Sequence, residues 1–181
     1  MKCDILIAAG LWNSGPQHWQ THWEAKYAKW ERVAHRDWHA PDRDEWVAEL
    51  DAAIAACDGR PILVAHSLGC MLVAQWAQAG SHLNVAGAFL VAPSDVDAPS
   101  YPIDAGGFSP VPMATLPFPS VVVASTDDPY AEIGRSRAFA QAWGSKLIEI
   151  GDAGHINADT GYGPWPEGER MLEAFCSTLQ P

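Results

Sequence analysis

The sequence predicts a single α/β domain in which a mostly parallel six-stranded sheet carries helices on both faces. Two observations lead to this fold class. Strand-like apolar segments and helical patterns alternate along the chain, which is typical of a parallel sheet covered by helices. Several of the strand-like segments are continuous apolar runs, as expected for strands buried on both faces. The 181 residues suffice for one sizeable core, so we expect one domain over 1–181.

Six segments have the length and the composition of buried strands. They are short and mostly apolar, and helical patterns separate most of them. We predict strands over residues 4–9, 31–35, 61–65, 85–92, 120–125 and 146–150.

The first helix is predicted over residues 16–30. Ser14 and Gln17 form a possible capping box before it, and Pro16 suits its first turn. Four aromatic residues recur at helical spacing in this segment, and we expect them to pack in the core rather than to bind a ligand. They are Trp19, Trp23, Tyr27 and Trp30.

Four further helices fill the remaining gaps. The second is predicted over 43–57, where Asp42 suits the N-terminus. The others are expected over 68–79, 131–143 and 166–179. One long irregular segment rich in Pro and Gly remains at 93–119, and a loop of this length is either functional or mobile.

Charge and hydropathy exclude several classes of partner. A net charge of −11 argues against binding to nucleic acid and to anionic membranes, because both need clustered Lys and Arg. No apolar run reaches the ~18 residues of a transmembrane helix. The N-terminus lacks the long apolar stretch and the cleavage site of a signal peptide, so we expect a cytoplasmic protein.

The most informative segment runs from an apolar strand through Ala65-His66-Ser67-Leu68-Gly69 into an apolar helix. Small residues at 65 and 69 let strand and helix approach closely, and the turn then holds Ser67 at its tip. The N-terminus of the following helix favours developing negative charge. The pattern predicts Ser67 as a nucleophile with the Leu68 N–H as an oxyanion donor. The alternative is an ordinary Ser-Leu-Gly turn that caps a helix.

A base and an acid are expected later in the chain, in the order acid then histidine. His155 follows the last predicted strand in a glycine-flanked loop and is the predicted base. Asp128 is the preferred acid because it directly precedes a turn proline, whereas Asp127 could instead hydrogen-bond the loop backbone. Asp95 and Asp152 are further candidates.

The loop after the first strand should supply the second oxyanion donor. The Leu11 N–H is the first choice, and the Trp12 N–H is the second. Four side chains are expected near the substrate: Trp12, His18, His66 and Trp165.

A metal site was considered for the first helix, where His18 and His22 lie four residues apart. The general-base glutamate of the H-E-x-x-H pattern is missing, because Trp19 stands in its place. We therefore expect no metal at these histidines.

With these residues in hand, the chain resembles the small serine hydrolases related to retinoblastoma-binding protein nine, the YdeN-like family. The resemblance spans most of the chain and implies a compact α/β-hydrolase without a lid domain. It also implies a triad of Ser67, Asp128 and His155, no cofactor, and an undefined natural substrate. It rests on motifs at 14–20, 65–69, 125–130 and 154–157, the last continuing to 161–166.

These inferences predict a serine hydrolase, in the first place a carboxylesterase that cleaves a small-molecule ester through a covalent acyl-enzyme. Two alternatives stay open. One is a thioesterase or acyltransferase with the same triad, and the other is a protein-interaction module on a hydrolase scaffold with little turnover. The sequence identifies no protein partner.

The 93–119 loop occupies the place where lipid hydrolases usually carry a helical lid, and its prolines preclude a long helix. We expect four of its side chains to close a small apolar pocket suited to short acyl groups. They are Tyr101, Phe108, Met113 and Leu116.

Overall fold

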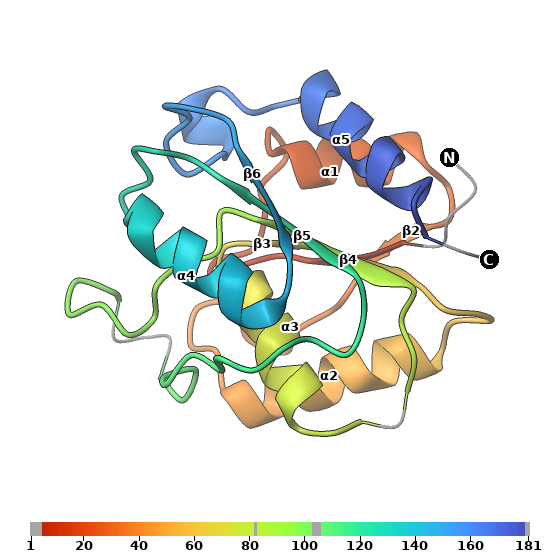
Figure 1. Ribbon diagram of the computed structural model, residues 1–181. Coiled ribbons are helices and arrows are strands. Elements are labelled where there is room, and N and C mark those ends of the chain that lie inside the picture. The colour runs from red at the N-terminus through yellow and green to blue at the C-terminus, as the bar shows by residue number, and fades with distance from the viewer. Residues whose placement is uncertain (1–4, 82, 103–105, 180–181) are drawn as a thin grey trace.

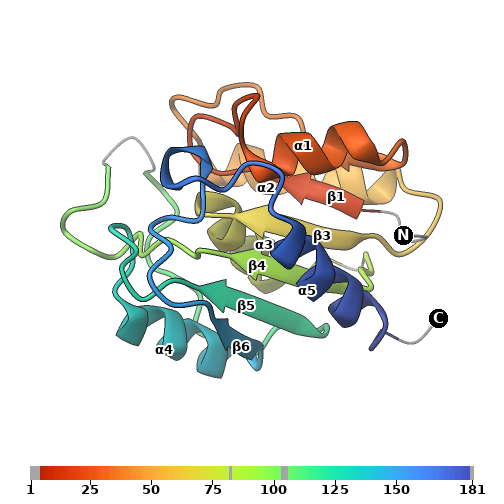
Figure 2. The same cartoon turned by 90° about the horizontal axis from the view of Figure 1, so that it is seen from above.

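The computed structural model describes residues 5–81, 83–102 and 106–179. Within these ranges six strands form one sheet in the order β2-β1-β3-β4-β5-β6, and every neighbouring pair is parallel. Figure 2 shows β1, β3, β4, β5 and β6 side by side. The predicted α/β class with a six-stranded sheet is therefore confirmed, and the sheet is wholly rather than mostly parallel.

The strands lie close to their predicted positions. The largest shift is at the second strand, which was expected to begin one residue later and to run three residues further. The observed strands are β1 Ile5–Ala8, β2 Trp30–Arg32, β3 Ile62–His66, β4 Gly87–Val91, β5 Ser120–Ala124 and β6 Lys146–Glu149.

The helices also match the predicted set, although most end earlier than expected. Within the described ranges, none is long and apolar enough to cross a membrane. The helices are α1 Trp19–Lys26, α2 Arg43–Ala55, α3 Leu68–Gln78, α4 Ile133–Trp143, α5 Pro166–Cys176 and a short 3₁₀ helix, η2, at Ala158–Thr160.

Each face of the sheet has its own apolar core, because successive strand residues point to opposite faces. In β1, Leu6 and Ala8 belong to one core, which also contains buried side chains of α2, α3 and α4. Ile5 and Ile7 belong to the other core, which α1 and α5 complete. Figure 1 shows α1 and α5 on one side of the sheet and α2 and α3 on the other.

The start of α1 differs from the prediction. His18 is the N-cap, and its Nδ1 accepts the Gln20 N–H at 3.2 Å. The expected capping box of Ser14 and Gln17 is wrong, because the Ser14 hydroxyl lies before the helix and donates to the Gln20 side chain at 2.6 Å. Histidine is an uncommon N-cap, whereas Ser, Thr, Asp and Asn are common ones, so the predicted helix begins too early.

The aromatic residues of this region do pack in the core, as expected. Trp19, Trp23 and Trp30 are buried in the cluster between the sheet and α5. The helix ends at Lys26, so Trp30 reaches that cluster from β2 rather than from a longer helix.

Candidate active site

The turn between β3 and α3 presents Ser67 in a strained conformation. Its φ of 56° and ψ of −124° lie where residues with a side chain are rarely found. Ser67 occupies the N-cap position, yet its side chain makes no capping hydrogen bond. An ordinary capping serine would use its hydroxyl to bind the first turn of the helix. The geometry therefore favours the exposed-nucleophile interpretation over the capping turn.

Two glycines allow the backbones around this turn to approach one another. A Cβ on Gly69 would lie 2.2 Å from the Ala8 carbonyl oxygen, so α3 packs against the end of β1 only without a side chain there. A Cβ on Gly10 would lie 2.8 Å from the Ser67 Cβ. The Gly69 position follows from the sequence pattern around the turn. The role of Gly10 depends on a contact between distant segments, and no local pattern indicates it.

Ser67, His155 and Asp128 form one hydrogen-bonded array. The Ser67 Oγ lies 2.8 Å from His155 Nε2, and His155 Nδ1 lies 2.9 and 3.0 Å from the two Asp128 carboxylate oxygens. The side chains of His155 and Asp128 are 8% and 3% exposed. The histidine ring thus hydrogen-bonds the serine hydroxyl on one side and the carboxylate on the other, which is the arrangement that serine hydrolysis requires.

Asp127 has a different task from its neighbour. Its Oδ1 accepts the Ala153 N–H at 2.8 Å, the Gly154 N–H at 2.7 Å and the Ser125 hydroxyl at 2.7 Å. The Ser125 hydroxyl and then these backbone groups lower the pKa of Asp127. Asp127 therefore anchors the backbone of the loop that carries His155, the role that the sequence had left open for it.

The two further acid candidates are engaged elsewhere. Asp95 accepts two hydrogen bonds from Arg135, each at 2.9 Å. Asp152 accepts the hydroxyl of Thr126. In the described part of the chain neither carboxylate hydrogen-bonds His155, so the geometry selects Asp128.

His66 connects the nucleophile turn to the base. Its Nε2 donates to the His155 carbonyl oxygen at 2.9 Å, which places the proton of a neutral ring on Nε2. Burial, and then the neighbouring His18 and His155, hold the pKa of His66 well below its ordinary value. The ring is therefore neutral and links the end of β3 to the loop that carries the base. Nothing in the sequence indicates this contact, because it joins residues 89 positions apart.

Two backbone N–H groups are available to bind an oxyanion. Leu68 is the first residue of α3, where N–H groups have no acceptor within the helix. Neither its N–H nor that of Leu11 meets an acceptor within the described ranges. The Trp12 N–H, the second choice from the sequence, already donates to the Trp38 carbonyl oxygen at 2.8 Å.

The loop after β1 is held in a strained shape. Trp12 and Asn13 both have φ of 64°. The Arg32 guanidinium donates to the Asn13 side chain at 2.7 Å and to the Ser14 carbonyl oxygen at 2.9 Å. Strain of this kind persists only where surrounding contacts enforce it. Arg32 thus helps to fix the loop that carries the Leu11 N–H.

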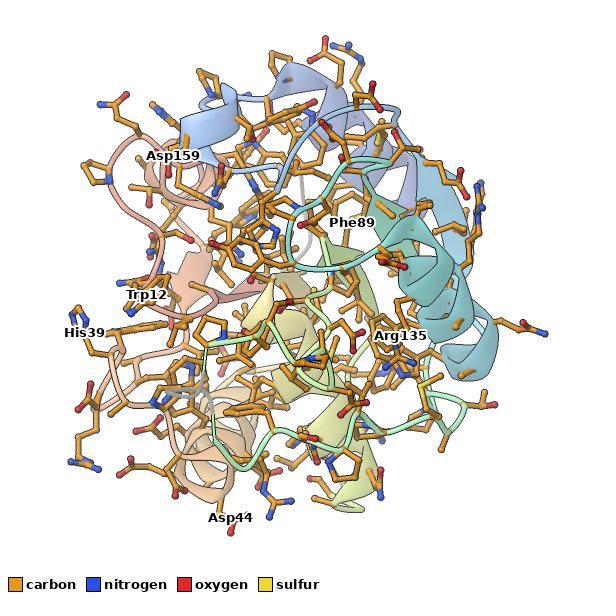
Figure 3. The ribbon with its side chains drawn as sticks, turned by 90° about the vertical axis from the view of Figure 1, so that its left-hand side faces the viewer. Trp12, His39, Asp44, Phe89, Arg135 and Asp159 are labelled. Atoms are coloured by element: carbon orange, nitrogen blue, oxygen red, sulfur yellow. The ribbon has the colours of Figure 1, made fainter. Side chains whose placement is uncertain are left out.

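A pocket of about 310 Å³ opens over Ser67 and His155. Its walls come from the loop after β1, from Tyr101 and Pro102, from Tyr130 and from the segment after His155. The Tyr130 ring meets the His155 ring edge-on, with 4.5 Å between centroids. Figure 3 shows Trp12 and Asp159, which both line this pocket, on the same side of the molecule. The volume is at the small end of the range for ligand sites.

Three of the four predicted substrate contacts line this pocket: Trp12, His18 and His66. Trp165 does not. It is buried at the start of α5, with its ring stacked on Trp23 at 5.8 Å between centroids. The expectation that Trp165 contacts the substrate is wrong, because its indole ring packs in the core against the aromatic side chains of α1.

The irregular segment between β4 and β5 contributes less to the pocket than expected. In its described residues it forms neither helix nor strand. Tyr101 lines the pocket, whereas Phe108 and Leu116 are buried in the core beside α3 and Met113 is 47% exposed. Apolar side chains of an irregular segment can face either core or pocket, and the sequence has no periodicity here to distinguish them.

No metal site is found within the described ranges, where no three His, Cys, Asp or Glu side chains are placed to hold an ion. His18 and His22 differ in surroundings. His18 lines the pocket, and His22 is partly exposed one turn further along α1.

Comparisons with known proteins agree with this geometry. A family model described as serine hydrolase matches residues 5–174. No relative is found among curated proteins. A solved YdeN-like hydrolase from Pectobacterium atrosepticum is 34% identical with a TM-score of 0.88, covering 99% of this chain and 93% of that chain.

Two more distant structures share the fold alone. The ydeN gene product of B. subtilis is 21% identical with a TM-score of 0.79, covering 98% of this chain and 100% of that chain. An esterase from Rhodococcus sp. is 14% identical with a TM-score of 0.69, covering 98% of this chain and 91% of that chain.

Proposed function

Since the chain belongs to the serine hydrolase family, we propose that it is a carboxylesterase that cleaves small acyl esters at Ser67. The observation that carries the proposal is the unbroken array from the Ser67 hydroxyl through the His155 ring to the Asp128 carboxylate. Two free N–H groups beside the nucleophile and a small pocket above it support the proposal further. An esterase is also among the solved proteins with this fold.

In the first half of the reaction, His155 Nε2 takes the proton of Ser67 as Oγ attacks the ester carbonyl carbon. Asp128 accepts the Nδ1–H of the ring, which keeps the reactive tautomer and stabilises the imidazolium that forms. The N–H groups of Leu11 and Leu68 bind the oxyanion. The imidazolium then protonates the departing alkoxide, and the acyl group remains on Ser67.

In the second half, water replaces the alcohol. His155 takes a proton from that water as its oxygen attacks the acyl carbon, and the same two N–H groups bind the second oxyanion. When the second tetrahedral intermediate collapses, His155 returns the proton to Ser67 Oγ and the carboxylic acid is released. No group other than these residues and water is needed.

The same array can act on thioesters or transfer an acyl group to another alcohol. Matched esters and thioesters therefore have to be assayed side by side. A binding module with little turnover is less well supported. Such a module has no physical need for a serine, a histidine and a carboxylate joined by hydrogen bonds of 2.8 to 3.0 Å.

Replacing the nucleophile tests the proposal. Ser67→Ala is expected to lower kcat for p-nitrophenyl acetate by roughly 10⁵- to 10⁶-fold, because the acyl-enzyme can no longer form. A fluorophosphonate probe should label the wild type and not this variant, while both melt at similar temperatures.

Ser177→Ala is the matched control, since this serine is exposed at the C-terminal end of α5 and does not line the pocket. That variant should keep both turnover and labelling. Undiminished turnover in Ser67→Ala would contradict the mechanism.

A further inference from the structure

His18 lies near Ser67 and His155, and one of its two ring nitrogens has no hydrogen-bond partner among the described residues. Its Nδ1 accepts the Gln20 N–H at 3.2 Å, as the N-cap of α1. A ring nitrogen that accepts a hydrogen bond carries no proton, so the single proton of the neutral ring is on Nε2. Burial first, then the Arg32 and His155 charges, lower the pKa of His18 to about 3, so the ring is neutral near pH 7.

The Nε2 donor has no partner. It is buried, and no acceptor lies within hydrogen-bond distance among the described residues. The neighbouring His66 ring, 4.7 Å away between centroids, differs in this respect, since its N–H bonds the His155 carbonyl oxygen. A buried donor without an acceptor is costly and calls for an explanation.

The place of His18 supplies that explanation. The residue is 5% exposed, and it lines the same pocket as Ser67 and His155. A molecule bound over the nucleophile therefore lies beside this ring. Of the residues described around the pocket, none is Lys or Arg, and Asp159 adds a negative charge. Such surroundings disfavour a carboxylate as the acceptor and favour a neutral oxygen.

We propose that His18 Nε2–H donates a hydrogen bond to a neutral oxygen of the substrate, so that the enzyme prefers esters with an ether or carbonyl oxygen close to the scissile bond. The proposal rests on the proposed esterase function and adds its substrate class. His18 acts here as a specificity residue, because the bond is absent for an aliphatic ester of the same shape. The reaction itself proceeds without it.

Matched substrates test the proposal directly. p-Nitrophenyl methoxyacetate and butyrate differ by one ether oxygen on the acyl side, and 2-methoxyethyl and butyl acetate differ likewise on the alcohol side. His18→Ser keeps a capping oxygen for α1 and removes the ring donor. The kcat/KM ratio within each pair is compared between wild type and variant, which cancels the intrinsic difference in reactivity of the two esters and any change in pocket volume that affects both alike.

The ether preference of at least one pair should fall roughly three- to tenfold in His18→Ser, as the loss of one neutral hydrogen bond implies. His22→Ser, one turn along the same helix and outside the pocket, should leave both ratios unchanged. If His18→Ser folds poorly, His18→Asn is the second capped variant. Unchanged ratios for both pairs in a folded His18 variant would overturn the proposal.

A binding measurement separates this proposal from the esterase proposal. In ¹⁵N-labelled Ser67→Ala, ethyl methoxyacetate should shift the His18 Nε2–H resonance, and ethyl butyrate should not. An equal response to both esters would overturn the role of His18 even if the enzyme is an active esterase. Absent turnover and absent fluorophosphonate labelling in the wild type would instead overturn the esterase function.

Discussion

The adjacent carboxylates of Asp127 and Asp128 take different roles in one turn. Asp128 faces the His155 ring, and Asp127 binds the backbone of the loop that carries His155. The first contact holds the tautomer of the base, and the second holds the position of its backbone. The two residues therefore offer a matched pair for separating chemistry from support.

Asp128→Asn is expected to lower kcat by about 10⁴-fold without unfolding the protein, because the histidine loses the acceptor that holds its reactive tautomer. Asp127→Asn should cost less than about tenfold, since its amide oxygen can still accept the N–H groups of Ala153 and Gly154. Both are checked by steady-state kinetics beside thermal melts. Reversed effects would mean that the acid role belongs to Asp127.

At the scale of elements, the site depends on how closely the loop after β1 packs against the turn between β3 and α3. Gly10 lies at this contact, and a Cβ there would meet the Ser67 Cβ at 2.8 Å and the His66 carbonyl oxygen at 3.0 Å. The second of these atoms is backbone, so it cannot rotate away. The contact sets the distance between the two oxyanion donors.

Gly10→Ala is therefore expected to displace the nucleophile turn and to lower kcat/KM on the order of 10²-fold, as a misplacement of about 1 Å commonly does. Gly134→Ala in α4 is the control, because its added Cβ would meet no atom within 4 Å. Kinetics on p-nitrophenyl acetate measure both. Wild-type rates in Gly10→Ala would show that the two segments can separate without harm.

The segment between β4 and β5 forms part of the pocket wall and so limits the size of the pocket. Its described residues do not form a helix over the pocket. Tyr101 forms part of the wall, and burial raises its pKa to about 12, so its hydroxyl stays protonated. Each methylene that enters the pocket adds about 0.8 kcal/mol of binding only while room remains. A pocket of about 310 Å³ fills quickly once an aryl alcohol is also bound.

We expect kcat/KM in a p-nitrophenyl ester series to peak at about two to four acyl carbons and to fall beyond them. Tyr101→Ala should move the optimum to longer chains by opening the wall, whereas Tyr101→Phe should keep it. A rate that climbs steadily to long chains in the wild type would indicate a groove that this structure does not contain.

At the scale of the whole molecule, the folded protein buries neutral histidines. His18, His35 and His66 all have lowered pKa values, chiefly because burial disfavours the charged ring. In the unfolded chain a histidine titrates near pH ~6.5. Below that pH the unfolded chain binds more protons than the folded one, so the free energy of unfolding falls as the pH is lowered.

Thermal melts should thus show a Tm that already falls between about pH 6.5 and pH ~5.5, about one pH unit above the pKa of an ordinary carboxylate. His18→Ser should flatten this dependence in part, because it removes one of the three described buried rings whose pKa is lowered. His39→Ser, at an exposed position, should leave the slope as it is. A Tm that is constant or rises on acidification would contradict the assignment of neutral buried rings.

Local patterns in the sequence were sufficient to predict the order of strands and helices along the chain, the turn at Ser67 and a glycine-flanked loop that carries His155. Strand-to-helix junctions and apolar runs depend on neighbouring residues, so they can be recognised without the fold. The preference for Asp128 over Asp127 also came from a local feature, the proline that follows it. The start of α1 was predicted wrongly, because His18 is an unusual N-cap. Trp165 was expected near the substrate but lies in the core, because its ring stacks on Trp23 of another helix.

By itself, then, the sequence determined the order of the elements along the chain, and it predicted candidate residues for the chemistry. Only the tertiary structure decided which polar groups are paired. The Leu11 N–H is unpaired whereas the Trp12 N–H is bonded, and His66 bonds the His155 carbonyl oxygen whereas His18 Nε2 has no partner among the described residues. The physical reason is that each of these outcomes depends on hydrogen-bond partners distant in the chain. The parallel strands bring those partners together at one edge of the sheet. A pattern of neighbouring residues therefore cannot predict which donors stay unpaired there.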